Sequence, residues 1–246
     1  IEVLQIALHL EPDSERRRAD VEKVIQQREK YLSDAVESYR SAVRQQPANP
    51  EIYDALGALY LMQGELGLAE DSFRSALKLA PDNAPARLHL GKTLYERMQI
   101  EEAIQAFQRV ILVQPNLAEA YQQLGIIEQE QGQLAEAIQH LQQARSLEPG
   151  DAMTHYHLGL AYQGQNLLSD AMTAYQTALR LKPDLAVAYS HLGDVYTQQG
   201  SLRVGLTFYQ KFLKLAKLRP DLKRQIAEVE TKSAELFKSE GGDARQ

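Results

Sequence analysis

The sequence predicts an all-α protein built from a repeated pair of antiparallel helices, because three kinds of residue recur with one period of 34 residues. Prolines recur at Pro47, Pro81, Pro115, Pro149 and Pro183. Leu-Gly dipeptides recur with glycines at Gly57, Gly91, Gly125, Gly159 and Gly193. Small residues follow twelve positions later, at Ala69, Ala103, Ala137, Ala171 and Gly205. Such a period indicates a solenoid, in which each unit buries its apolar face against its neighbours.

Each part of the period has a physical reason. A glycine inside a helix costs about 1 kcal/mol relative to alanine, so a repeated one predicts a close helix crossing, with Gly57 opposite Ala69. The prolines predict the end of each second helix. Turns between the two helices are expected at Gly64, Gly132 and Gly200, with Met98 and Asn166 in their place in the other two units. We expect N-caps at Asn49, Asn116 and Asp184.

A second-helix ring or leucine completes the pattern, at Phe73, Phe107, Leu141, Tyr175 and Tyr209. With these residues the chain resembles the tetratricopeptide repeat family over residues 50–219. The resemblance implies a right-handed superhelical solenoid whose first helices line a concave face. It implies ligand contacts at positions 2, 5, 6, 9, 12 and 13 of each repeat, counting from Pro50 as position 1.

The expected organisation follows the same register. Residues 1–49 are expected to hold a half-repeat at Ile1 to Pro12 and a degenerate repeat, in which Glu22-Lys23 replaces Leu-Gly. The full repeats are expected at 50–83, 84–117, 118–151, 152–185 and 186–219. A capping helix over 220–238 and a disordered tail over 239–246 would follow. Because the chain begins with Ile1 and not Met, we expect the natural protein to extend further.

Composition and motifs give catalysis no candidate residue. The chain has no cysteine and a formal net charge of −6, which argues against thiolate chemistry and against general nucleic-acid binding. Gly91-Lys92-Thr93 lacks the first glycine of a phosphate-binding loop and lies inside a predicted helix. His155 and His157 lie on different sides of one helix and cannot share a metal. We therefore expect no enzyme activity, no cofactor and no metal.

The predicted binding surface is a row of side chains on the first helices. Position 6 supplies an imidazole or an amide in four consecutive repeats, and such groups can hydrogen-bond the backbone of a peptide. This row resembles the asparagine ladder of the O-linked N-acetylglucosamine transferase superhelix. We expect the tyrosines at position 4 (Tyr53, Tyr121 and Tyr189), and His155 at the same position, to be core residues. The predicted peptide-binding residues at positions 5, 6 and 9 are Asp54, Ala55, His89, Lys92, Gln122, Gln123, Ile126, Tyr156, His157, Leu160, Ser190, His191 and Asp194.

The leading hypothesis is a scaffold or assembly factor that holds a peptide or helix of a client protein. Two alternatives are a substrate-recognition arm of a larger enzyme, such as a glycosyltransferase, and a self-associating structural oligomer. The glutamine-rich composition suits a bacterial protein. We expect a cytoplasmic location, or tethering to a membrane such as the thylakoid if a segment precedes Ile1; the client itself is not predicted.

Overall fold

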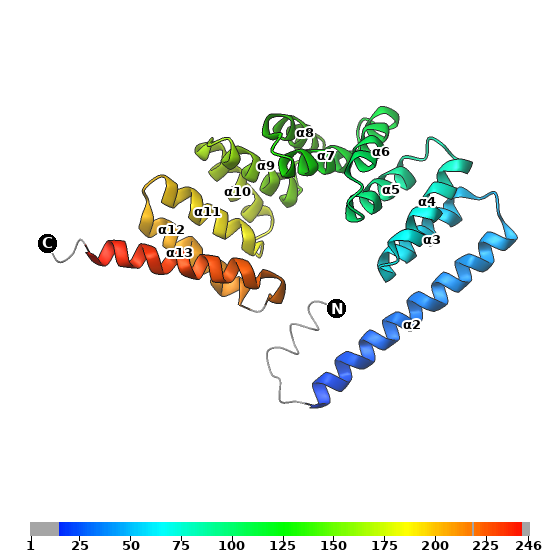
Figure 1. Cartoon of the computed structure of the whole chain (residues 1–246), viewed down its shortest axis with the longest axis horizontal. Coiled ribbons are helices and arrows are strands. Elements are labelled where there is room, and N and C mark those ends of the chain that lie inside the picture. Colours follow the sequence, from blue (N-terminus) through cyan, green and yellow to red (C-terminus); the bar gives the residue numbers. More distant parts are fainter. Residues whose placement is uncertain (1–14, 218, 243–246) are drawn as a thin grey trace. The chain divides into compact units, whose positions relative to one another are not determined.

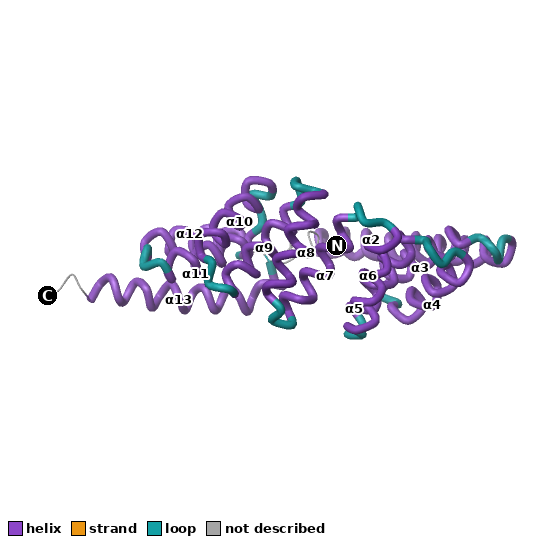
Figure 2. The backbone as a smooth tube through the Cα atoms, turned by 90° about the horizontal axis from the view of Figure 1, so that it is seen from above, coloured by secondary structure: helices purple, strands orange, loops and turns teal. Residues whose placement is uncertain are grey.

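The computed structural model of the chain describes residues 15–217 and 219–242 (Figure 1). Every regular element among these residues is helical, and the loops between them are short (Figure 2). The chain forms two compact units, which divide between Ile127 and Glu128 near the end of one helix. Ile1 to Pro12, the expected half-repeat, lies outside the described residues. None of the described helices is both long and apolar enough to cross a membrane.

The first unit contains a long helix followed by two helix pairs and most of a further helix. Within it, α3 packs against α4 and α5 packs against α6, while α4 contacts α5 across the boundary between pairs. The helices are α2 (Glu15–Gln45), α3 (Pro50–Gln63), α4 (Leu66–Leu79), α5 (Ala84–Glu96), α6 (Ile100–Val113) and α7 (Ala118–Glu130).

The second unit repeats this arrangement and ends with an added helix. Here α9 packs against α10 and α11 against α12, while α8 contacts α9 and α10 contacts α11. Its helices are α8 (Leu134–Leu147), α9 (Ala152–Gly164), α10 (Leu168–Leu181), α11 (Ala186–Gln198), α12 (Leu202–Ala216), the 3-10 turn η1 (Pro220–Leu222) and α13 (Lys223–Gly242).

In the α3–α4, α5–α6, α9–α10 and α11–α12 pairs, the glycine of the first helix makes room for the ring of the second helix. A Cβ on Gly57 would lie 2.6 Å from Cε1 of Phe73, and a Cβ on Gly193 would lie 2.4 Å from the ring of Tyr209. Both rings are almost completely buried. The close crossing is therefore as predicted, but the group that requires the glycine is the aromatic ring and not Ala69, the partner predicted from the spacing.

All five turns inside the helix pairs use a residue in the left-handed region. The φ angles are 80° at Gly64, 77° at Gly132 and 78° at Gly200. Met98 and Asn166 adopt the same conformation, with φ of 61° and 60°. The turn positions predicted from the sequence are thus confirmed, and Met98 accepts a conformation that costs an L-residue with a side chain about 1–2 kcal/mol.

Helix starts agree with the sequence only in part. Asn49 caps α3 by accepting a hydrogen bond from the amide of Glu51 at 3.0 Å. Asp184 does not cap α11, because the capping position is Leu185. Asn116 likewise lies two residues before Ala118, where α7 begins. The side chains that cap in this way include Asn83 and Asp151, which occupy the same register as Asn49.

Residues 15–45 form one unbroken helix, although a degenerate repeat would have a turn between two helices. The physical reason is that Lys30, a good helix former, stands in register with the turn residue Gly64, while Glu22-Lys23 replaces the small residue that a close crossing needs. At about 1.5 Å per residue, α2 is roughly 46 Å long and α3 roughly 21 Å. The first half of α2 therefore extends past α3 (Figure 1), and it leaves the ring of Tyr31 and the side chain of Val24 exposed.

The end of the second unit is closed by η1 and α13. Leu222 and Val229 are buried in a cluster with Leu206, Tyr209 and Phe212. Ile226 and Leu236 pack against the same cluster. The helix continues to Gly242, so it includes the first residues of the segment expected to be disordered, while residues 243–246 lie outside the described part of the chain. An apolar end that would otherwise face water is thereby covered.

Candidate functional site

The predicted position-6 residues lie on α3, α5, α7, α9 and α11, and they are half-buried. Half-burial is what a recognition surface needs, because the side chain is fixed by neighbours while its polar edge remains accessible. We call these residues the ladder: Ala55, His89, Gln123, His157 and His191. The first three belong to the first unit and the last two to the second.

In the first unit, the ladder residue His89 is held by an acidic neighbour. Its Nδ1 lies 2.9 Å from Oδ1 of Asp54, a predicted position-5 residue of the preceding helix pair. Its ring packs against Phe73, with 5.4 Å between centroids. Because the partner of Nδ1 is a carboxylate oxygen, Nδ1 donates the hydrogen bond. The other ring nitrogen, Nε2, has no part in that hydrogen bond.

The remaining predicted residues of the first unit are less closely connected to one another. Lys92 forms an ion pair with Glu119 on α7, which occupies repeat position 2. Gln122, Gln123 and Ile126 are half-buried on α7. The described contacts therefore join Asp54 with His89 and Lys92 with Glu119, as two separate polar pairs.

In the second unit, the predicted residues form an aromatic and imidazole cluster. The ring of Tyr156 lies 5.2 Å from that of His157 and 5.8 Å from that of His191, between centroids. His191 stacks on Tyr175 at 5.7 Å with an interplanar angle of 15°. Tyr156 is only 8% exposed, so its ring packs against the two imidazoles and presents little surface to a ligand. Leu160 is half-buried on the same helix.

Hydrogen bonds orient the ladder residues of this cluster. Nδ1 of His157 lies 3.2 Å from Oε1 of Gln129, and the hydroxyl of Tyr175 donates to Oε1 of Gln163 at 2.8 Å. The predicted residue Ser190 is 7% exposed, and its hydroxyl donates to the carbonyl oxygen of Val187. The hydroxyl of Ser190 is thus used within its own helix and is not directed to a ligand.

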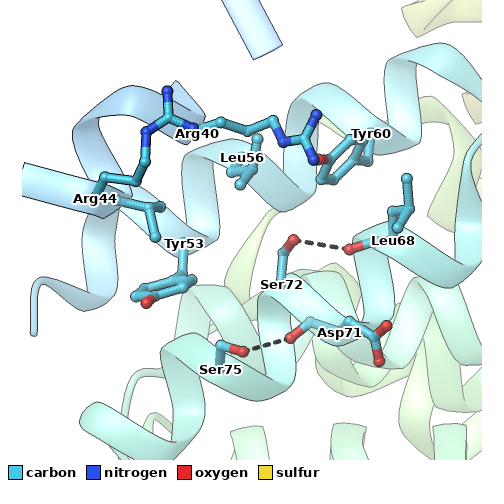
Figure 3. A pocket seen from close by; sticks show the side chains of 10 residues that line it. Arg40, Arg44, Tyr53, Leu56, Tyr60, Leu68, Asp71, Ser72 and Ser75 are labelled. Atoms are coloured by element: carbon cyan, nitrogen blue, oxygen red, sulfur yellow. Dashed lines mark hydrogen bonds between the residues drawn. The ribbon is translucent and has the colours of Figure 1, made fainter. Parts of the chain in front are cut away.

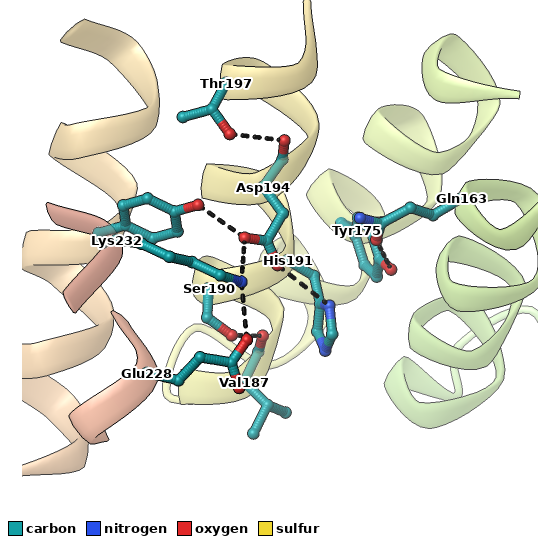
Figure 4. Close-up of polar contacts among 10 residues, drawn as sticks. Gln163, Tyr175, Val187, Ser190, His191, Asp194, Thr197, Glu228 and Lys232 are labelled. Carbon is teal, nitrogen blue, oxygen red and sulfur yellow. Dashed lines mark hydrogen bonds and ion pairs between the residues drawn. The ribbon is translucent and has the colours of Figure 1, made fainter. Parts of the chain in front are cut away.

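Asp194 is the centre of a polar network that reaches the last helix (Figure 4). Its Oδ1 accepts hydrogen bonds from the hydroxyl of Tyr209 at 2.6 Å and from Nζ of Lys232 at 2.8 Å. Lys232 also pairs with Glu228 on α13 at 2.8 Å. The other carboxylate oxygen of Asp194 lies 3.9 Å from Nδ1 of His191. Asp194 was predicted to contact a ligand, but its carboxylate is already paired with Lys232 of the chain's own helix α13.

Burial keeps the imidazoles of His157 and His191 uncharged at neutral pH. It lowers the pKa of His157 to about 4, against a small opposing effect of Asp151. Burial also lowers the pKa of His191, where Lys232 acts in the same direction and the carboxylates of Asp194 and Glu228 oppose it. The pKa of Tyr156 is raised to about 12 by burial. The cluster thus offers neutral hydrogen-bonding groups and aromatic edges.

Sequence reasoning missed several residues that shape this face. Glu119 lies at position 2, which the family resemblance had already marked as a contact position. Tyr175 belongs to the second-helix pattern and was counted as a structural residue. Lys232 and Glu228 lie beyond the last full repeat; continuing the 34-residue count from Pro220 puts Glu228 at position 9, in register with Asp194, and Lys232 one helical turn further along.

The position-4 residues have a structural role at the boundary between helix pairs. The hydroxyl of Tyr53 donates to the carbonyl oxygen of Pro47, and that of Tyr189 donates to Pro183, each at 3.2 Å. Nε2 of His155 lies 3.0 Å from the carbonyl oxygen of Pro149. His155 is buried, whereas Tyr53, Tyr121 and Tyr189 are half-buried. These side chains join each first helix to the preceding proline turn.

The fold and this surface define an α-helical repeat array with an interaction face. Profiles of known families agree: the Tetratricopeptide repeat profile matches residues 60–125, and the TPR repeat profile matches residues 30–64, 127–166 and 165–200. The chain belongs to the tetratricopeptide repeat family. No curated protein matches the chain.

Solved structures show the same fold. MamA from Desulfovibrio magneticus RS-1, from residue 41 to its end, is 22% identical, with a TM-score of 0.63 over 70% of this chain and 97% of that chain. Another crystal structure of MamA is 27% identical, with a TM-score of 0.60 over 66% of this chain and 95% of that one. YrrB, described as a TPR protein with an unusual peptide-binding site, is 19% identical, with a TM-score of 0.62 over 78% and 99%.

Proposed function

We propose that this protein is a non-catalytic scaffold or assembly factor that binds a peptide or helix of a client protein at the ladder residues of each unit. The observation that carries the proposal is the uncharged, half-buried cluster of His157 and His191 on Tyr156 and Tyr175. The family is one of interaction modules, and the similar protein YrrB is described as having a peptide-binding site. The cytoplasm is the proposed location.

The chemistry of the ladder favours recognition of a peptide backbone. In His157 the Nδ1 proton points to Gln129, so Nε2 of the neutral ring accepts a hydrogen bond. A backbone N–H of a bound segment is a suitable donor, and it is present whatever the sequence of the client. Glutamine at position 6, as in Gln123, can both donate and accept. Preference for particular clients would then come from half-buried apolar side chains, Leu160 in the second unit and Ile126 in the first.

The test is selection of binding peptides from a random display library at pH 7. The native chain is compared with two variants, His89→Ala with Gln123→Ala for the first unit and His157→Ala with His191→Ala for the second. The control variant replaces four exposed glutamines of the second helices by alanine: Gln105, Gln108, Gln139 and Gln210. Circular dichroism must first show equal helix content in all four chains.

We expect the ladder variants to lose at least tenfold in affinity for the selected peptides, and the control to retain it. A library peptide that binds the ladder variants and the native chain equally would contradict the proposal. Light scattering of the native chain gives a separate result, because a stable oligomer without a selected peptide would favour the structural alternative.

A further inference from the structure

Two helix pairs carry the same two tyrosines, four periods of 34 residues apart. In the α11–α12 pair, Tyr189 and Tyr196 hold the ring of Phe208 between them. The centroid of Phe208 lies 6.3 Å from that of Tyr189, with 26° between planes, and 5.2 Å from that of Tyr196, with 8°. Near-parallel rings at these distances stabilise one another beyond the effect of burial.

A cation completes this aromatic stack. Nζ of Lys211 lies 5.4 Å from the centroid of Phe208 and 5.7 Å from that of Tyr189. An ammonium group at this distance is attracted by the negative face of the rings. The α11–α12 pair therefore contains a complete arrangement of two tyrosines, one inserted ring and one cation.

The α3–α4 pair has the same tyrosines, Tyr53 and Tyr60, but no inserted ring. Ser72 stands in register with Phe208, and Ser75 stands in register with Lys211. Both serine hydroxyls donate to carbonyl oxygens of their own helix, Ser72 to Leu68 and Ser75 to Asp71, each at 2.7 Å (Figure 3). Both serine hydroxyls therefore have hydrogen-bond partners in their own helix and need none in the space between Tyr53 and Tyr60.

The small serines leave a pocket of about 260 Å³ where the second unit has a ring. An engineered cavity of about 150 Å³ in another protein admits benzene, so this volume is sufficient for an aromatic side chain. The lining residues are Arg40, Val43, Arg44, Tyr53, Leu56, Tyr60, Leu68, Asp71, Ser72 and Ser75. They include neither Asp54 nor Ala55, so the pocket is separate from the ladder.

Two arginines of α2, Arg40 and Arg44, line the pocket together with the carboxylate of Asp71. The side chains of Arg40 and Arg44 are 58% and 65% exposed, and both lie near a single carboxylate, that of Glu37, at 3.7 Å and 3.5 Å. Gln176 stands in register with Arg40, and its amide donates to the hydroxyl of Tyr196 at 3.4 Å. The first unit therefore places the guanidinium group of Arg40 where the second unit has a neutral amide, whereas Arg44 has Arg180 in register.

We propose that this pocket binds an aromatic side chain of a partner polypeptide, with an acidic residue beside it. The ring inserts between Tyr53 and Tyr60, above Ser72, as Phe208 inserts between Tyr189 and Tyr196. The neighbouring carboxylate faces Arg40 and Arg44. The evidence for this site is the internal comparison with the α11–α12 pair, and it is independent of the ladder.

The absence of tryptophan from the chain permits a direct test. The probe is the tripeptide Asp-Trp-Asp with both ends blocked, held at fixed concentration while the protein is added. Burial of the indole shifts its emission to shorter wavelength. We expect a saturable shift with a dissociation constant on the order of 1 mM, as suits one buried ring. The blocked tripeptide Asp-Leu-Asp, used as a competitor, should be at least fivefold weaker.

Three variants distinguish binding in this pocket from binding elsewhere on the chain. Ser72→Phe fills the pocket from inside and should abolish the shift, while Phe208→Ser opens the corresponding space in the second unit and should add a second binding event. Arg40→Glu with Arg44→Glu, at exposed positions, should weaken the acidic probe at least fivefold and leave a blocked Gly-Trp-Gly probe unchanged. As a control, the ladder variant His89→Ala with Gln123→Ala should bind the probe normally.

Any of three results would overturn the proposal. These are a native chain that produces no shift, a correctly folded Ser72→Phe chain that binds as the native one does, and loss of binding in the ladder variant. If Ser72→Phe lowers the helix content, the arginine variant is used instead. An unchanged affinity of that variant for the acidic probe would equally contradict the proposed site.

Discussion

The α3–α4 and α11–α12 pairs have the same helix lengths to within a residue and the same glycine crossing, yet they differ in how completely they are filled. In α11–α12, Phe208 fills the space between two tyrosines and Asp194 is paired with Lys232 of the next helix. In α3–α4, Ser72 leaves that space open, and Ala58 takes the place of Asp194. The residues that the two pairs share determine the backbone. The residues that differ, Ser72 against Phe208 and Ala58 against Asp194, determine whether the surface of the pair is filled or open.

The largest effect is expected from adding one methyl group to the glycine at the helix crossing, which both pairs share. Gly193→Ala places a Cβ 2.4 Å from the Tyr209 ring and 3.2 Å from the carbonyl oxygen of Gly205, whereas the three atoms nearest to a Cβ at Gly57 all belong to the Phe73 ring, the first at 2.6 Å. We expect a net loss of about 3 kcal/mol for Gly193→Ala and about 2 kcal/mol for Gly57→Ala, after the gain in helix propensity. Urea unfolding measures the loss of unfolding free energy in each variant, and equal losses would contradict the expected difference between the two helix pairs.

Breaking the contact of the last helix tests the closed end. Asp194→Ala removes the acceptor of Tyr209 and Lys232, both of which remain partly enclosed, so we expect the free energy of unfolding to fall by about 2 kcal/mol. Hydrogen exchange in α13 should accelerate more than exchange in α9. The matched change Ala58→Asp in the first unit introduces the same carboxylate without a corresponding lysine, and it should give no stabilisation.

Acid should weaken the second unit through His157. Its pKa in the folded protein is about 4 and its usual value is 6.5, so the unfolded chain binds the additional proton between these values. Stability present above pH 6.5 is therefore lost as the pH falls toward 4. We expect the loss to be about 2 kcal/mol between pH 7.5 and pH 5. His157→Gln should remove this part of the pH dependence. If the free energy of unfolding still fell as steeply between pH 7.5 and pH 5, the effect would not come from His157.

The smallest expected effect concerns the turns. Met98 adopts the left-handed conformation that glycine supplies at Gly64 and Gly200, and its side chain is 78% exposed. Met98→Gly should therefore stabilise the first unit by about 1 kcal/mol, because the strain is relieved and little packing is lost. Gly64→Met is the reverse control and should destabilise by a similar amount. Thermal unfolding followed by circular dichroism would detect both shifts.

The period of 34 residues was sufficient to predict the helix pairs and the five turns, because turn geometry and crossing distance depend on residues at fixed spacing. The prediction of a degenerate repeat before residue 50 was wrong, since it followed the second-helix residues and overlooked Lys30 in the register of the turn glycine. The partner of Gly57 was misassigned to Ala69, because spacing alone does not show how far the ring of Phe73 extends. Asn116 and Asp184 were misassigned as caps for a similar reason, as the helices begin two residues later.

For the candidate site, the sequence indicated which side chains share a face but not what they contact. The position-6 residues were selected from the repeat register, and the structure adds that Asp54 holds His89 and that Gln129 holds His157. Asp194 was expected to be available to a ligand, and its pairing with Lys232 depends on a helix beyond the last full repeat. The pocket beside Ser72 follows from an internal comparison of side-chain volumes, which a search for conserved spacing does not make.

The hydrogen bonds from position 4 to the proline carbonyls bear on how the array unfolds. Tyr53, His155 and Tyr189 each bond a carbonyl oxygen of the turn that connects their helix to the preceding one, so these bonds fix that connection and not the packing within a pair. In a one-dimensional array, such terms determine the cooperativity between neighbours. A chain that lost them would melt pair by pair over a broad range of temperature, whereas the bonds present here favour unfolding in longer blocks that start at an end.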